Sequence, residues 1–115
     1  MKVTTVAKKI ATALDDMKAL DVRVMDVRKI TSIADVIIIA SGRSDRHLRA
    51  LADSAAETAR GCKLRVLGTE GERTGEWVLV DLGDIIVHLM HPMSRAYYQL
   101  EKLWSDGKRV RAVSK

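Results

Sequence analysis

Residues 36–40 of this 115-residue chain read Val36-Ile37-Ile38-Ile39-Ala40, an uninterrupted apolar run that strongly constrains its fold. The run is too short for a helix of ordinary length, and its β-branched residues favour an extended backbone. A strand with one face in water alternates apolar and polar residues, whereas a strand covered on both faces has no such alternation. The run therefore predicts the central strand of a sheet that is covered on both faces.

Amphipathic helices are predicted on either side of this strand. Upstream, apolar residues recur every three or four positions over residues 3–20, with charged residues between them. Downstream, a similar apolar stripe begins at Asp45 and ends at Gly61, a residue type that commonly terminates helices. Ser44 is a natural N-cap for this second helix, and Asp45 suits the positive end of its dipole.

The remaining strands are predicted from short apolar stretches. A β-branched stretch at residues 22–28 and an alternating stretch at residues 63–67 are both typical of strands. Residues 77–81 and 84–90 are two further apolar stretches separated by Leu82-Gly83, and glycine permits the positive φ of a tight turn. These last two stretches predict an antiparallel hairpin.

The other segments are a loop, a helix and a tail. Residues 68–75 are polar and rich in Gly and Glu, as in a loop, and Ser94 can cap a last helix at residues 95–104. The order of elements predicts an α/β (α+β) fold with a single mixed five-stranded sheet and helices packed on it. We expect one domain over residues 1–105 and a flexible basic tail over residues 106–115.

Composition excludes several classes of protein. With 47% apolar and 30% charged residues, the chain can bury a core and is not expected to be disordered. Its single cysteine, Cys62, excludes an internal disulfide, and the lack of a Cys/His cluster excludes structural zinc. No apolar stretch has the length of a membrane span, so a cytoplasmic location without membrane contact is expected. Most of the net charge of +5 falls in the tail, which weakens the case for direct nucleic-acid binding.

The predicted hairpin sorts its side chains onto two faces. A turn at Leu82-Gly83 would place Leu79 opposite Ile86 and Trp77 opposite His88. One face is then wholly aliphatic and is expected to lie against the helices: Val78, Val80, Leu82, Ile85, Val87 and Leu89. The other face mixes aromatic, charged and titratable groups: Trp77, Leu79, Asp81, Asp84, Ile86, His88 and Met90. It is either covered by a helix, a loop or a second copy of the chain, or it docks a basic protein through Trp and Met anchors.

Other residues raise chemical alternatives. The turn Ser41–Asp45 leads into a helix N-terminus, where backbone N–H groups can bind a phosphate, but it matches neither the dinucleotide motif nor the P-loop. A small nucleotide-binding or nucleotidyltransferase-like enzyme that uses this turn is the runner-up function. His47, His88 and His91 lack the spacing of a metal site on one helix. Ordinary surface or interface histidines are expected instead.

Two further groups of charged residues bear on partners. Arg43, Arg46 and Arg49 follow the same turn at three-residue spacing and are candidates for a weak contact with ribosomal RNA, although such spacing is more often a solvated helix face. Asp81 and Asp84 flank a tight turn and fit the converging carboxylates of a magnesium site badly. We expect them to shape the turn and to offer charge to a partner.

Four motifs, in order and at matching spacing, carry a resemblance to a known family. They are Ser32-Ile33-Ala34-Asp35, the segment Ala40–His47, the segment Gly75–His88, and Tyr98-Gln99-Leu100-Glu101-Lys102-Leu103-Trp104. Over about residues 3–105 the chain resembles the ribosomal silencing factor family, also called the Iojap family. The resemblance implies a fold similar to nucleotidyltransferases without transferase activity, and a protein that works without a cofactor.

The resemblance also implies a partner and a site. Members of the family bind the large ribosomal subunit through its surface protein fourteen, block joining of the small subunit, and tend to form homodimers. The matching motifs carry over a set of partner-binding residues: Trp77, Asp81, His88, Arg95, Tyr98 and Glu101. The mixed face of the hairpin adds Leu79 and Met90 to this set. We therefore expect a translation repressor that acts by occupying space, not an enzyme.

Overall fold

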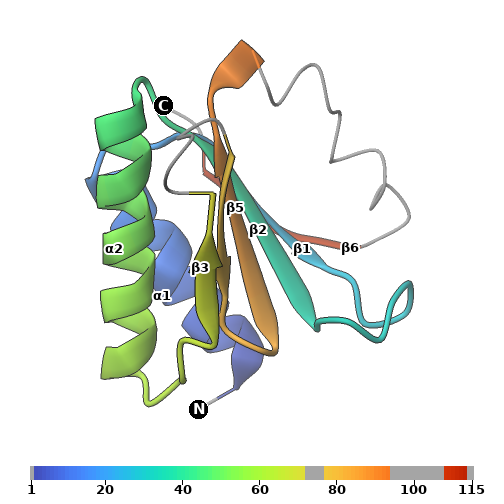
Figure 1. Cartoon of the computed structure of the whole chain (residues 1–115). Helices are drawn as coiled ribbons and strands as arrows, with labels where there is room; N and C mark the ends of the chain where they lie inside the picture. Colours follow the sequence, from blue (N-terminus) through green and yellow to red (C-terminus); the bar gives the residue numbers. More distant parts are fainter. Residues whose placement is uncertain (1, 72–76, 94–107, 114–115) are drawn as a thin grey trace.

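The computed structural model describes residues 2–71, 77–93 and 108–113 and has two helices packed on one face of a mixed sheet (Figure 1). The helices are α1 (Val3–Asp16) and α2 (Asp45–Gly61). The strands are β1 (Leu20–Asp26), β2 (Val36–Ser41), β3 (Gly68–Glu70), β4 (Trp77–Asp81), β5 (Ile85–Met90) and β6 (Lys108–Val113). They lie in the order β3-β4-β5-β2-β1-β6, and only β2 and β5 run parallel.

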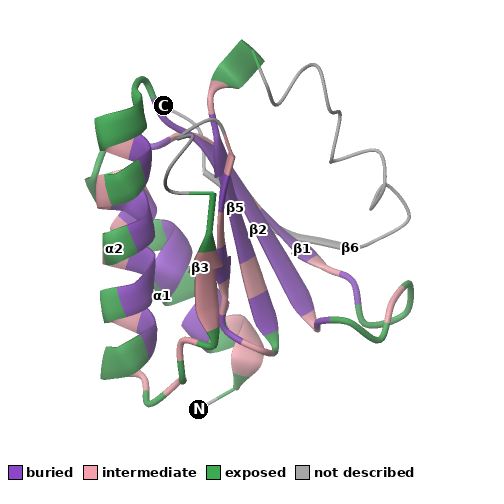
Figure 2. Cartoon of the chain, in the orientation of Figure 1, coloured by how far each residue is buried: buried purple, intermediate pink, exposed green. Residues whose placement is uncertain are grey.

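The central position of β2 confirms the prediction from residues 36–40. Every residue of β2 is buried (Figure 2). Its alternate residues belong to different apolar clusters, because successive side chains of a strand point to opposite faces. Ile38 packs in the core beneath the helices, whereas Ile37 and Ile39 belong to a second, smaller cluster on the other face.

Both helices end in the same way, at a lysine with left-handed backbone. Lys18 has a φ of 68° and Lys63 a φ of 64°. In each case the next residue donates back to the last turn: Ala19 N–H to Leu14 O (3.0 Å), and Leu64 N–H to Ala59 O (2.8 Å). This is the Schellman arrangement, in which the chain reverses away from the helix axis. It ends α1 at Asp16, before the predicted residue 20.

The same turn explains why the predicted strand at residues 63–67 is wrong. Lys63 and Leu64 form the turn that ends α2, so an extended strand can begin only after them. Along the chain, pairing with the sheet begins at Leu67, whose N–H donates to Asp81 O at 2.8 Å. The strand is β3, which occupies part of the segment that we expected to be a loop.

The carboxyl-terminal region also differs from the prediction. Residues 108–113, expected in a flexible basic tail, form β6, which pairs antiparallel with β1 as a sixth strand at the sheet edge. Pairing at an edge uses backbone groups, and edge strands commonly carry charged residues, so a basic sequence is compatible with this position. The helix predicted at residues 95–104 lies outside the described residues. The likeness to nucleotidyltransferases stays a prediction.

Candidate protein-docking face

The β4–β5 hairpin has a turn one residue later than predicted. Leu82 N–H donates to Ile85 O at 2.9 Å, so the two central turn residues are Gly83 and Asp84 instead of Leu82 and Gly83. Gly83 has a φ of 83°, which a residue with a side chain rarely adopts. Asp84 therefore lies exposed in the turn, and not on the strand where we expected it.

This later turn moves the register but leaves the two faces intact. Trp77 lies opposite Met90, not opposite His88, and Leu79 lies opposite His88. Each pairing moves by two positions, and because side chains alternate with a period of two, no residue changes face. The six aliphatic residues predicted to face the helices all lie in the core beneath them.

The other side of the sheet, here called the second face, extends beyond the hairpin. Register places three residues of β4, three of β5 and neighbours from β2 and β1 on it: Trp77, Leu79, Asp81, Ile86, His88, Met90, Ile37, Ile39 and Met25. Sequence reasoning missed the contributions of β2 and β1. The signal was present, since a strand that is apolar at every position must supply residues to both faces.

Burial varies across the second face. Met90, Ile39, Ile37 and Met25 are buried together in the smaller cluster, and Trp77 packs against them. Four residues on the β4 side are only half-buried: Trp77, Leu79, Asp81 and Ile86. We call these four the docking strip. Met90 is fully buried, so it supports this strip from within instead of offering contact area.

His88 fixes the orientation of the Trp77 ring. The indole N–H of Trp77 donates to Nδ1 of His88 at 3.1 Å, and the ring centroids lie 5.8 Å apart. His88 is 8% exposed, and burial lowers its pKa from 6.5 to about 4. The imidazole is therefore neutral at pH 7, with Nδ1 free of a proton and able to accept this bond. Because little of its own surface is accessible, His88 can affect a contact on this face only by positioning Trp77.

Acidic groups lie within and beside the docking strip. The Asp81 carboxylate accepts a hydrogen bond from Gly83 N–H at 2.9 Å, which holds the turn as the sequence suggested. Asp84 is exposed in this turn, and its carbonyl accepts hydrogen bonds from Asp35 N–H (2.9 Å) and Val36 N–H (3.1 Å). On the neighbouring strand, Glu70 is exposed beside Leu79. A half-exposed apolar strip with acids at its rim is suited to a basic protein surface.

The turn considered for phosphate binding is occupied by its own hydrogen bonds. The Ser44 side chain accepts from His47 N–H at 3.0 Å, confirming the predicted N-cap, and His47 Nδ1 accepts from Arg43 N–H at 3.0 Å. Gly42 N–H donates to Met90 O, and Asp45 pairs with His91 at 2.8 Å. These contacts describe a closed strand-to-helix turn whose donors largely serve the chain itself.

The remaining residues singled out in the sequence lie elsewhere. Arg43 donates to Lys18 O at 3.2 Å, while Arg46 and Arg49 are exposed on α2, on the helical side of the sheet. Within residues 2–71, 77–93 and 108–113, no three His, Cys, Asp or Glu residues are grouped to hold a metal ion, and no helix is long and apolar enough to cross a membrane. Arg95, Tyr98 and Glu101 lie outside the described residues.

Comparison with known proteins assigns the chain to a family. The family described as "Ribosomal silencing factor during starvation" matches residues 1–115. The chain is similar to the ribosomal silencing factor RsfS of Chromobacterium violaceum, at 40% identity over 98% of this chain and 93% of that protein. It is similar to the RsfS of Bacillus subtilis at 40% identity over 93% of this chain and 91% of that protein.

A more distant relative and a solved structure extend the likeness. A mouse protein named "Mitochondrial assembly of ribosomal large subunit protein 1" is 36% identical over 76% of this chain and 40% of its own length. A crystal structure of a Chromobacterium violaceum protein superposes with a TM-score of 0.88 at 40% identity, covering 91% of this chain and 88% of that one. That crystal structure therefore shares the fold described above for this chain.

Proposed function

The chain belongs to the ribosomal silencing factor family, and on that premise we propose that it binds the large ribosomal subunit at surface protein fourteen through the docking strip. Bound there, it blocks association with the small subunit and represses translation without any catalytic step. The observation that carries this proposal is the half-buried Trp77, which packs on a buried apolar cluster and is oriented by His88.

Trp77 has the properties of an interface anchor. Tryptophan is among the residues that contribute most to protein interfaces, especially where the ring is held in place before binding. The hydrogen bond to His88 and the packing against the smaller cluster restrict this ring in the free protein. Binding then costs little rotamer entropy, and the apolar surface still exposed on Leu79 and Ile86 becomes available for burial.

The charges around the docking strip support a basic partner. Asp81, Asp84 and Glu70 lie at or beside the strip, and the described residues of β4 and β5 carry no Lys or Arg. Acidic groups at a rim accelerate encounter with a basic surface and disfavour acidic competitors more than they add affinity. One relative carries the large ribosomal subunit in its name, which fits this kind of partner.

Steric exclusion needs only a bound body of sufficient thickness. The chain measures 31 × 30 × 25 Å, and the helices lie on the side of the sheet away from the docking strip. A protein held by the strip therefore presents its helical layer outward. Two ribosomal surfaces that must meet closely cannot do so across a body of this size, which explains repression without chemistry.

Sedimentation with purified ribosomal subunits tests the proposal. We expect the wild-type chain to co-sediment with large subunits and to prevent their association with small subunits. Trp77→Ala should weaken binding at least tenfold, because an oriented anchor is lost. Met17→Ala, which removes an exposed apolar side chain at the end of α1, is the matched control and should bind as the wild type does.

Two outcomes would contradict the proposal. Subunits that associate equally well with and without saturating protein would exclude steric silencing. Full binding by a folded Trp77→Ala variant would exclude the docking strip. The homodimer, a weak ribosomal RNA contact through Arg43, Arg46, Arg49 and the basic tail, and the cytoplasmic location stay predictions. Sedimentation velocity with and without RNA tests the first two.

A further inference from the structure

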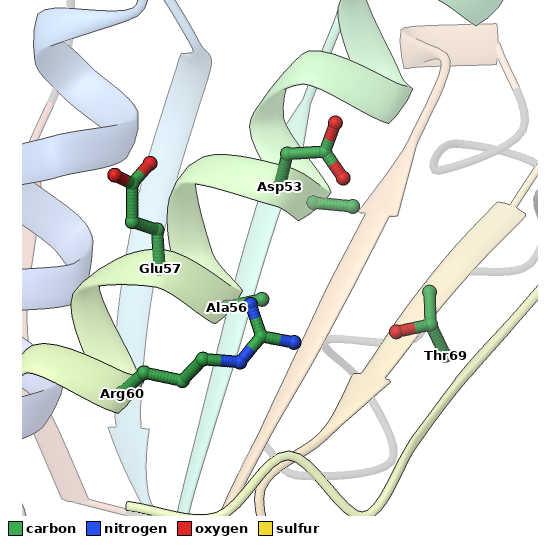
Figure 3. A pocket seen from close by; sticks show the side chains of 6 residues that line it. Asp53, Ala56, Glu57, Arg60 and Thr69 are labelled. Carbon is green, nitrogen blue, oxygen red and sulfur yellow. The ribbon is translucent and has the colours of Figure 1, made fainter. Parts of the chain in front are cut away.

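A groove lies between α2 and β3, a strand at one edge of the sheet. In the part of the chain that the structure describes, β3 pairs with β4 on one side only and ends the sheet. Between β3 and α2 lies a cavity of about 400 Å³, lined by Ala52, Asp53, Ala56, Glu57, Arg60 and Thr69 (Figure 3). The docking strip is not part of this groove.

The geometry of the groove allows a further strand to pair with β3. Thr69 lies opposite Val80, a residue of the helix-facing core, so Thr69 points to the α2 side of the sheet. On α2, the facing residues Ala52 and Ala56 are small, and they leave space between α2 and the sheet for the side chains of an added strand. On the opposite side, a Cβ placed on Gly68 would meet no atom within 4 Å. A strand added to β3 would thus run alongside this cavity, and its side chains on the helical side of the sheet would face α2.

An edge strand also supplies the means of binding. Alternate residues of an edge strand leave backbone N–H and C=O groups without a sheet partner, and an extended peptide can pair with them. Because β3 has only three residues, such pairing would be short and would need side-chain contacts to add selectivity. We propose that this groove binds an extended basic peptide segment of another protein, added to β3 as a further strand.

Charge selects the basic character of the peptide. Asp53 and Glu57 are exposed on α2, and Glu70 is exposed on β3 on the other side of the sheet plane. Basic side chains at every second position of an added strand all point to one face of the sheet, where they would meet Asp53 and Glu57. Arg60 is the one basic group among the lining residues. In Figure 3 its guanidinium extends from α2 toward Thr69, where it can donate to carbonyl oxygens of the added strand.

Labelled peptides test this inference on the full chain. The probe is a fluorescein-labelled Lys-Val-Lys-Val-Lys-Val peptide, followed by fluorescence anisotropy at moderate salt. Comparison peptides replace every Lys by Glu, or every Val by Pro, which lacks the backbone N–H that pairing with β3 requires. We expect binding of the basic peptide only, together with slower amide exchange in Gly68–Glu70. Equal binding of the acidic or the proline peptide would overturn the proposal.

Charge-reversal variants complete the test. Asp53→Lys combined with Glu57→Lys should weaken binding of the basic peptide at least tenfold, because the two exposed acids of α2 that line the groove reverse sign. Asp16→Lys makes the same type of change at an exposed site at the end of α1 and should alter binding less than twofold. Equal loss in the groove variant and the Asp16 variant would overturn a specific site. Subunit binding through Trp77 should be unaffected, which separates this test from that of the proposed function.

Discussion

The two faces of the β4–β5 hairpin use the same two strands for opposite purposes. On the side of the helices, every side chain from Val78 to Leu89 that points inward is aliphatic and almost completely buried. On the second face, Met90 and His88 are buried while Trp77 and Leu79 stay half-exposed. A side chain buried within the chain contributes to folding and has no area left for a partner.

Half-buried residues combine both roles. Part of the Trp77 ring packs on the chain, and His88 sets its direction, so the exposed part has a defined position before a partner arrives. We therefore expect substitutions on the helix side to act on stability, and substitutions on the docking strip to act on binding.

The largest expected effect comes from placing a carboxylate on each face. Val87→Asp buries an unpaired charge beneath the helices, at a cost of several kcal/mol that rivals a typical total stability of about 5–15 kcal/mol. We expect circular dichroism to find this variant unfolded. Leu79→Asp, on the half-exposed strip, should fold and lose subunit binding. If Leu79→Asp unfolds as completely as Val87→Asp, the two faces do not differ in the way described.

Acid should destabilise the protein through His88. Because burial lowers the pKa of His88 to about 4 from 6.5, the unfolded chain takes up a proton at a higher pH than the folded chain does. The contribution of neutral His88 is complete above pH 6.5 and is lost as the pH falls toward 4, by about 3 kcal/mol in all. Urea unfolding at both ends of this range measures the loss. His88→Leu should lose clearly less stability than the wild type over the same range, and an equal loss would show that His88 is not responsible.

Orientation of the indole is expected to matter less than its presence. His88→Leu leaves the Trp77 N–H without its acceptor, and losing one hydrogen bond of about 1 kcal/mol corresponds to roughly fivefold weaker subunit binding. His88→Asn keeps an acceptor near the position of Nδ1 and should restore most of the affinity. Co-sedimentation titrations would compare the two variants. Equal binding by both would mean that the hydrogen bond does not position Trp77.

The smallest effect is expected where α2 ends, away from the second face. Lys63→Gly relieves the left-handed backbone at φ 64° and should stabilise the fold by about 1 kcal/mol without changing subunit binding. Lys9→Gly, at an exposed site within α1, should instead destabilise by a similar amount. Thermal unfolding distinguishes the two variants. A loss of stability in Lys63→Gly would contradict the role assigned to the helix-ending turn.

Local pattern predicted some elements well and others badly. The run Val36–Ala40 and the Ser44 cap of α2 were predictable, because both depend on residues adjacent in sequence. The end of α1 and the segment after α2 were not, because the residues in the left-handed positions are Lys18 and Lys63 and not glycine. Gly61 suggested the end of α2 correctly, yet the chain reverses two residues later, so the strand was expected too early.

The candidate face was predictable in part for the same reason. Alternation along residues 77–90 assigned Trp77 and Leu79 to one side, and that assignment survived a turn that is displaced by one residue. Alternation did not predict how deeply each side chain is buried. Met90 and His88 are buried because β2 places Ile37 and Ile39 beside them. The residues adjacent to Met90 and His88 in the sequence do not indicate this contact.

Strand alternation alone establishes which residues can share a face, because the period of a strand is a property of the backbone. Sequence motifs also indicated the family without any structural information. Three arrangements became apparent only in the folded chain: β2 lies parallel to β5, residues 108–113 pair with β1 at one edge of the sheet, and β3 is the last strand at the other edge among the described residues. Those arrangements depend on pairing between segments far apart in the chain. Burial and hydrogen bonding in such pairs depend on both segments at once, so neither segment predicts them alone.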